Sequence, residues 1–213
     1  MINKRINPLI LTILITFNGC GQKKNNSSDS KNQESLSLNK GDYAVEISTS
    51  KLIWTGKEVS TKQHNGTLNI KNGQIIISDK GLISGDIEID MSSINTTDIK
   101  GRGKDRLDGH LKSPDFFDVK KHPVAFLKFQ GNEKNFSDGK LKFDGELTIK
   151  NISHPISFFS TIENVNGKLS ARAEVTFDRS LYNVRFGSGK FFDNLGDRLI
   201  YDEISIDVFI VTA

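Results

Sequence analysis

The sequence predicts an all-β protein whose strands close into an antiparallel barrel. Three observations carry this prediction. Apolar and polar residues alternate with a period of two in several segments of residues 42–213, glycine is frequent (18) while proline is scarce (4), and phenylalanine supplies 14 residues. Alternation places successive side chains on opposite faces of a strand, and this composition is typical of short strands joined by glycine-containing turns.

Residues 1–19 are predicted to be a lipoprotein signal peptide. Two basic residues precede an apolar stretch from Leu9 to Phe17, and Gly19 stands directly before Cys20, the single cysteine of the chain. The apolar stretch is shorter than the roughly 20 residues of a membrane-spanning helix, and the order of regions is that of a secretory signal. It resembles a bacterial lipoprotein signal, which implies lipidation of Cys20. We therefore expect a lipoprotein of the cell envelope, anchored to a membrane on its periplasmic side or at the cell surface.

Residues 20–41 are predicted to be a polar tether, and residues 42–213 the folded domain. The tether is rich in Ser, Asn, Lys and Gln, and such a composition cannot bury enough surface to order itself. Loss of two basic residues with the signal leaves 27 Lys and Arg against 26 Asp and Glu. A nearly neutral protein without a concentrated basic face argues against a nucleic-acid partner.

The predicted strands follow one another along the chain. In the clearest segment, Leu141 and Phe143 face one way while Lys142 and Asp144 face the other. Closing a meander of about nine such strands removes its exposed edges, which favours a barrel. Strands are expected at residues 43–55, 66–70, 74–78, 83–89, 124–130, 141–149, 156–163, 171–178 and 204–210. Hairpin turn signals stand at Asn72-Gly73, Asp138-Gly139 and Asn166-Gly167.

Two longer segments interrupt the alternation. Residues 91–119 contain a short helical stretch around residues 105–111, and residues 180–201 are rich in Gly and Phe. Long segments without strands in a compact domain are commonly lids or binding loops.

Several unusual stretches occur in a fixed order from Trp54 onward. They are WTGKEVSTKQHNGTLNIKNG, GDIEIDMSSINTTD, LDGHLKSPDFFDVKKHPVAFLKF, LTIKNISHPISF and FDRSLYNVRFGSG. In this order they resemble the YceI-like family of lipid/polyisoprenoid-binding domains over nearly all of residues 42–213. The resemblance implies an extended, lipocalin-like barrel with an elongated apolar cavity that holds an isoprenoid chain or a similar long-chain lipid. It allows a dimer but does not define the oligomeric state. Asn151 stands where the family usually has Gly, which leaves the choice of ligand open.

Aromatic side chains are the candidates for the lining of such a cavity. Removing a methylene from water contributes about 0.8 kcal/mol, so an apolar pocket suffices to hold a lipid without any catalytic group. A phenylalanine on the inner face of a barrel is also ordinary core, and both readings stay open. The candidates are Trp54, Phe116, Phe117, Phe126, Phe129, Phe143, Phe158 and Phe177.

A cluster of basic residues in the predicted helical stretch is the candidate head-group site. Arg102, Arg106 and His110 could place positive charge at the cavity mouth to receive a pyrophosphate or carboxylate. The alternative is a solvated basic loop.

No metal, cofactor or catalytic site is predicted. The four histidines, at positions 64, 110, 122 and 154, have no close pairing along the sequence, and no nucleophile stands beside a base. We expect a membrane-tethered protein that holds an isoprenoid or similar lipid for binding, storage or transfer. The alternatives are a structural or stress-response envelope lipoprotein that uses the barrel as an interaction scaffold and, less favoured, a lipid-modifying enzyme.

Overall fold

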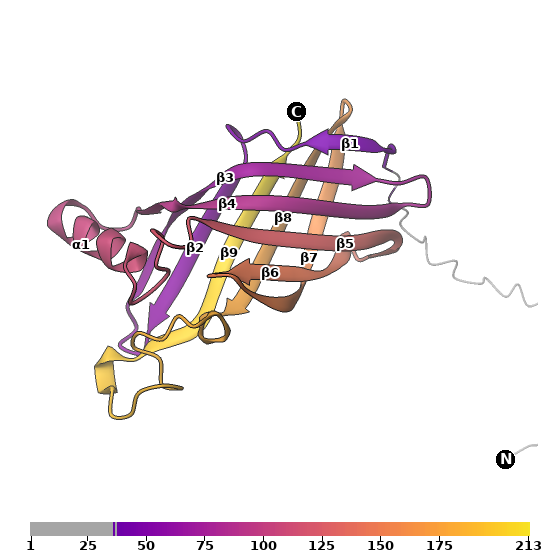
Figure 1. Cartoon of the computed structure of the whole chain (residues 1–213). Coiled ribbons are helices and arrows are strands. Elements are labelled where there is room, and N and C mark those ends of the chain that lie inside the picture. The colour runs from indigo at the N-terminus through magenta and orange to yellow at the C-terminus, as the bar shows by residue number, and fades with distance from the viewer. Residues whose placement is uncertain (1–35, 37) are drawn as a thin grey trace, which may run out of the picture. The chain divides into compact units, whose positions relative to one another are not determined.

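Eight antiparallel strands close into a barrel in the computed structural model, which describes residue 36 and residues 38–213 (Figure 1). The predicted signal peptide and most of the predicted tether lie outside the described residues. The barrel strands are β2 (Lys51–Glu58), β3 (Gln63–Ile77), β4 (Leu82–Thr96), β5 (Val124–Ser137), β6 (Lys140–Ile149), β7 (Ile152–Val165), β8 (Lys168–Asp178) and β9 (Ile200–Val211).

The strands are joined in chain order, so the barrel is an up-and-down meander. Each strand from β2 to β9 pairs antiparallel with the next, and β9 closes the barrel by pairing with β2, where Ile206 lies opposite Trp54. A short additional strand, β1 (Gly41–Ala44), pairs with the end of β3, where Gly41 lies opposite Ile77. This confirms the predicted all-β barrel. Closure satisfies the backbone groups that an open sheet would leave at its edges.

Two of the three predicted hairpin turns are confirmed. Asp138-Gly139 and Asn166-Gly167 have positive φ angles at both positions, as a two-residue hairpin loop of type I′ requires. The prediction at Asn72-Gly73 is wrong, because β3 runs straight through it. Asn72 lies opposite Glu88, and the register with β4 shifts between Ile70 and Asn72, so the pair belongs to a bulged strand.

The predicted strand at residues 43–55 is two strands. β1 ends at Ala44 and β2 begins at Lys51, and a turn separates them in which Glu46 O accepts from Ser50 N at 3.0 Å. The buried positions change from odd to even numbers across the turn, from Val45 to Leu52 and Trp54, so the two strands do not share one alternating pattern. Because the chain turns here, β1 can pair with the end of β3 while β2 pairs with β9.

A tight turn without glycine joins β6 to β7. Lys150 and Asn151 both have positive φ angles, 53° and 61°. The Lys150 ammonium donates hydrogen bonds to Phe116 O at 3.1 Å and to Asn183 O at 2.8 Å. One side chain therefore links the two segments that lack strands, and burial lowers its pKa.

These two segments lie at the same end of the barrel (Figure 1, left). The first carries α1 (Gly101–Lys112), which is longer than the predicted stretch, and the second carries the 3₁₀ turns η1 (Arg179–Tyr182) and η2 (Gly196–Arg198). The first segment was predicted to begin at Met91, but β4 continues past a bulge to Thr96. No helix within the described residues is long and apolar enough to cross a membrane.

Candidate functional site

An apolar cavity of about 210 Å³ runs through the inside of the barrel. Its lining includes residues from all eight barrel strands and from α1. Along β3 it reaches from His64 to Ile77, which at about 3.3 Å per residue corresponds to roughly 40 Å of strand. A cavity of about 210 Å³ with so extended a lining is narrow, so its shape suits a linear chain better than a bulky ring system.

Seven of the eight predicted aromatic residues line this cavity. Phe129, Phe143 and Phe158 form a cluster on its wall, with ring centroids 5.2 to 5.7 Å apart. Their contact with a ligand stays a prediction. The seven lining residues are Trp54, Phe116, Phe117, Phe129, Phe143, Phe158 and Phe177.

Phe126 does not line the cavity, contrary to expectation. It lies on the outer face of β5 with 38% of its surface exposed. Ala125, Leu127 and Phe129 line the cavity instead. Because side chains alternate along a strand, Phe126 and Phe129, three positions apart, cannot share a face.

The indole of Trp54 is the unusual feature of the wall. Its ring lies over Gly66, where an added Cβ would come within 2.6 Å of Trp54 Cζ2. Trp54 Nε1 is buried and has no hydrogen-bond partner among the described residues. An unpaired buried donor costs about 1–3 kcal/mol, so the packing of Trp54 against Gly66 carries an energetic penalty in the described fold.

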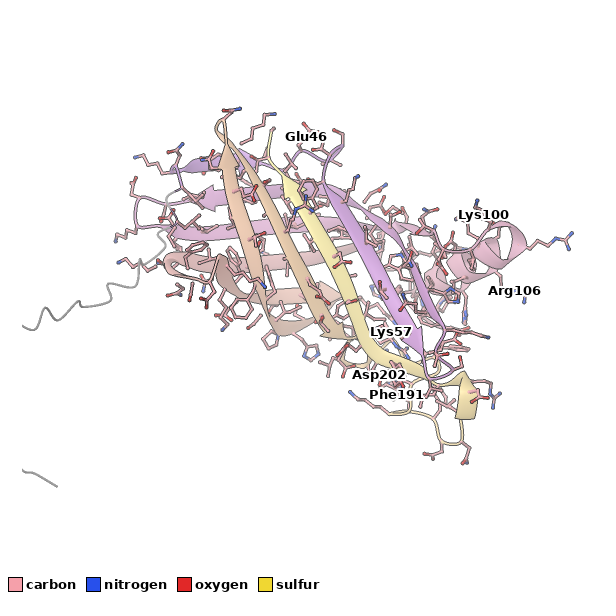
Figure 2. All side chains as sticks on the ribbon, turned by 180° about the vertical axis from the view of Figure 1, so that it is seen from behind. Glu46, Lys57, Lys100, Arg106, Phe191 and Asp202 are labelled. Carbon is pink, nitrogen blue, oxygen red and sulfur yellow. The ribbon has the colours of Figure 1, made fainter. Side chains whose placement is uncertain are left out.

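Charged and titratable lining residues gather at the end of the barrel that carries α1. They are Lys57, Glu58, His64 and Arg179, none of which was predicted from the sequence. Lys57, which Figure 2 labels, lines the cavity and is exposed to solvent, and we call this end of the cavity the mouth. Their convergence follows from the pairing of β2 with β3 and β9, which no local pattern reports.

His64 is held in place by Asp98. His64 Nδ1 lies 2.8 Å from Asp98 Oδ2, and Asp98 Oδ1 accepts from Asn65 N at 3.0 Å. Burial alone would raise the pKa of Asp98, but the hydrogen bonds from His64 and Asn65 outweigh it and keep the pKa below its usual value. Asp98 is therefore a fixed anion at the mouth.

Arg179 lies at the same end and is fully buried. Its guanidinium donates to three backbone carbonyls, those of Val184 at 3.0 Å, Ile200 at 3.1 Å and Tyr201 at 3.2 Å. Asp202 Oδ1 lies 3.3 Å from Nη2 and supplies the opposite charge. Burial lowers the pKa of Arg179, and Asp202 opposes this effect.

The three predicted head-group residues do not reach the cavity wall. Arg102 and Arg106 are exposed on α1 (Figure 2 labels Arg106), and neither lines the cavity. His110 packs between Phe116 and Phe186, at centroid distances of 4.9 and 4.4 Å. Leu107 and Leu111 of α1 line the cavity instead, because the apolar face of the helix turns inward and its basic face turns outward.

Asp108 fastens α1 to the end of β4. Its Oδ1 accepts from Thr96 N at 2.8 Å and from Thr96 Oγ1 at 2.6 Å, while Lys104 pairs with Oδ2. Thr96 is fully buried, so this contact holds the helix against the end of the barrel.

In the part of the chain that the structure describes, no group of three or more His, Cys, Asp and Glu could hold a metal ion.

A closed antiparallel barrel around a long apolar cavity defines a lipocalin-like protein. The chain belongs to the YceI-like family, because the model of the YceI-like domain matches residues 43–212. A search of curated proteins found no match.

Solved structures of similar fold come from several bacteria. BcnA of Burkholderia cenocepacia has a TM-score of 0.64 at 21% identity, over 79% of this chain and 99% of that one. A polyisoprenoid binding domain from Saccharophagus degradans, implicated in plant cell wall breakdown, has a TM-score of 0.57 at 14% identity, over 80% and 97%. The YceI protein of Campylobacter jejuni has a TM-score of 0.50 at 20% identity, over 68% and 84%. At these identities the similarity shows the fold.

Proposed function

We propose that this protein binds an isoprenoid or a similar long-chain lipid in the barrel cavity, for storage or transfer and without catalysis. The observation that carries the proposal is the cavity itself, whose wall is almost entirely apolar from Ile77 to the mouth. Family membership and the similarity to a polyisoprenoid binding domain support the same ligand class.

Burial of a hydrocarbon chain supplies the affinity. Ten methylenes moved from water into the cavity contribute roughly 8 kcal/mol before the cost of ordering the chain. The narrow cavity favours a linear chain.

The lining residues support binding over catalysis. Ser160 is the hydroxyl residue of the lining, and its Oγ donates to the backbone carbonyls of Thr161 and Arg172, both at 3.0 Å. Neither partner is a base. His64, the lining imidazole, pairs with Asp98 at the mouth. The described cavity thus lacks the nucleophile and adjacent base that acyl or phosphoryl transfer through a covalent intermediate requires.

The proposal includes a lipid anchor at Cys20 and a place in the cell envelope. The signal-like order of residues 1–19 supports both. Replacing Cys20 with Ser in the expressed full chain tests the anchor. The wild type is expected in the membrane fraction, and the variant is expected to be released by a salt wash. Retention of the variant after that wash would contradict an acyl anchor.

The ligand is tested by extracting the purified full chain for mass spectrometry. We expect a co-purified long-chain lipid in the wild type and its loss in Ala125→Phe, which fills the cavity, while the matched outer-face variant Phe126→Ala retains it. Thermal unfolding of all three proteins checks that they fold. If the wild type carries no lipid and the stripped protein takes up no added polyprenyl phosphate, the proposed function is wrong.

A further inference from the structure

Exposed apolar side chains gather beside the mouth. Five come from the segment between β8 and β9 and its junction with β9, and each exposes 40–50% of its surface. Figure 2 labels Phe191 and Asp202 at the same end of the barrel. We call them the apolar rim: Leu181, Phe186, Phe191, Phe192 and Tyr201.

The rim is held outward by a polar network. Ser188 is fully buried, and its hydroxyl donates to Asp202 Oδ2 at 2.9 Å. Its carbonyl accepts from Phe191 N and Phe192 N, both at 3.1 Å. Lys190, which lies between Ser188 and Phe191 in the sequence, forms an ion pair with Asp178. These interactions fix the backbone of residues 188–192. The fold itself therefore holds the rings of Phe191 and Phe192 toward solvent.

Positive charge is concentrated at the same end. Residues 38–213 carry 24 basic and 24 acidic residues, but residues 98–122 and 178–202 together carry 11 basic and 9 acidic residues. The rest of the domain is correspondingly acidic. Lys100, which precedes α1, and Arg102 and Arg106 on α1 form no ion pair among the described residues, and Figure 2 labels Lys100 and Arg106 at this helix.

Exposed aromatic residues beside unpaired basic residues are the combination that binds the interface of an anionic bilayer. A second copy of this chain fits less well, because a symmetric contact would set one basic end against another. The described chain also begins at the far end of the barrel, where Leu38 N donates to Glu133 Oε1 beside the turn between β3 and β4. Leu38 therefore lies at the opposite end of the barrel from the mouth.

We propose that the apolar rim and the basic face of α1 form a membrane-docking surface that sets the mouth of the cavity against an anionic bilayer. This inference rests on the proposed function, since docking gives a membrane lipid a path into the cavity without crossing water. The rim enters the interface, and the lysines and arginines of α1 contact anionic head groups.

The test is cosedimentation of the full chain carrying Cys20→Ser, which removes the anchor, with phosphatidylcholine vesicles that contain or lack phosphatidylglycerol. We expect binding to the anionic vesicles that weakens with added salt. Phe191→Ser combined with Phe192→Ser is expected to reduce it about tenfold, while Phe159→Ser, which removes an exposed phenylalanine from the outer face of β7, leaves it unchanged. Arg102→Gln with Arg106→Gln is expected to lower binding to anionic vesicles only.

Equal binding by the rim variant and the wild type, or no binding to anionic vesicles, would overturn the proposal. So would a concentration-dependent dimer in analytical ultracentrifugation that the rim variant abolishes. The lipid content found by mass spectrometry separates the two proposals. A protein that contains lipid but does not bind vesicles contradicts the docking proposal alone. A protein that binds vesicles but never contains lipid contradicts the proposed function.

Discussion

Arg179 Nη2 and Asp202 Oδ1 lie 3.3 Å apart at the end of the barrel cavity. The guanidinium is fully buried, and beyond Asp202 its partners are backbone carbonyls, which accept hydrogen bonds but carry no net charge. Arg179 also lies over the ring of Phe116, 5.6 Å from its centroid. A cation beside an apolar cavity needs an opposite charge, and Asp202 supplies it while accepting from Ser188 in the adjoining segment.

Replacing Asp202 with Asn should destabilise the protein. The amide keeps an acceptor for Ser188 but leaves the Arg179 cation without a counter-charge, and breaking a buried pair in this way costs about 3 kcal/mol. Urea unfolding measures the change. Asp207→Asn, on an exposed position of the same strand, is the matched control and should alter stability by less than about 0.5 kcal/mol. Equal midpoints for the two variants would contradict this role.

The contact of Asp108 with β4 should make the protein sensitive to acid. Burial would raise the pKa of Asp108, but hydrogen bonds from Lys104 and Thr96 outweigh it and lower the pKa below 3.8. A carboxyl whose pKa is lower in the folded state stabilises the fold above pH 3.8, and this stabilisation is lost as the pH falls through the folded pKa. Asp108→Asn should therefore be about 2 kcal/mol less stable than the wild type at pH 7, with the difference shrinking in acid.

Urea unfolding of both proteins across the acidic range checks that prediction. Asp105→Asn, an exposed carboxyl on the same helix, is the control and should follow the wild type. A stability difference for Asp108→Asn that stays constant down to the lowest pH would argue that the carboxylate charge is irrelevant to helix docking.

Two glycine substitutions should act in opposite directions. At Gly145 an added Cβ would lie 2.1 Å from the backbone oxygen of Lys128, so β5 and β6 must move apart, at a cost of about 2 kcal/mol. At Gly109, inside α1, nothing lies within 4 Å of the added atom. Gly109→Ala should therefore stabilise the helix by roughly 1 kcal/mol. Thermal and urea unfolding test both, and a stable Gly145→Ala would show that the strand pairing differs from that described.

Trp54 should report on the cavity. It is the single tryptophan of the chain and lies in the cavity wall, so entry of a lipid must change its surroundings. Titration of delipidated protein with a polyprenyl phosphate should shift and saturate its emission. Ala125→Phe should abolish the response, and Trp54→Phe should remove the signal itself. Bound lipid found by mass spectrometry without any change in emission would place the ligand elsewhere.

Local patterns predicted much of the barrel. Alternation assigned the inner faces of β6 and β8 because a one-sided strand repeats every two residues, and the turns at Asp138-Gly139 and Asn166-Gly167 follow from residues that tolerate positive φ angles. The same reasoning failed at Asn72-Gly73, where pairing with β4 holds a turn-prone pair inside a bulged strand. It also failed to predict the turn at Lys150-Asn151, where tertiary hydrogen bonds hold a lysine in a strained conformation.

The sequence by itself determined the fold class, the family resemblance and seven aromatic residues of the cavity lining, with Phe126 predicted in error, since each depends on residue type and on spacing along one strand. Only the tertiary structure decided which charges meet at the mouth. Lys57, His64 and Arg179 stand on different elements and converge through the closure of β2 against β9. It also turned Arg102 and Arg106 away from the cavity, because the leucines of α1 pack inward and leave the basic face outside. Long-range strand register, which no local pattern encodes, fixes the first outcome, and the packing of the apolar face of α1 on the barrel fixes the second.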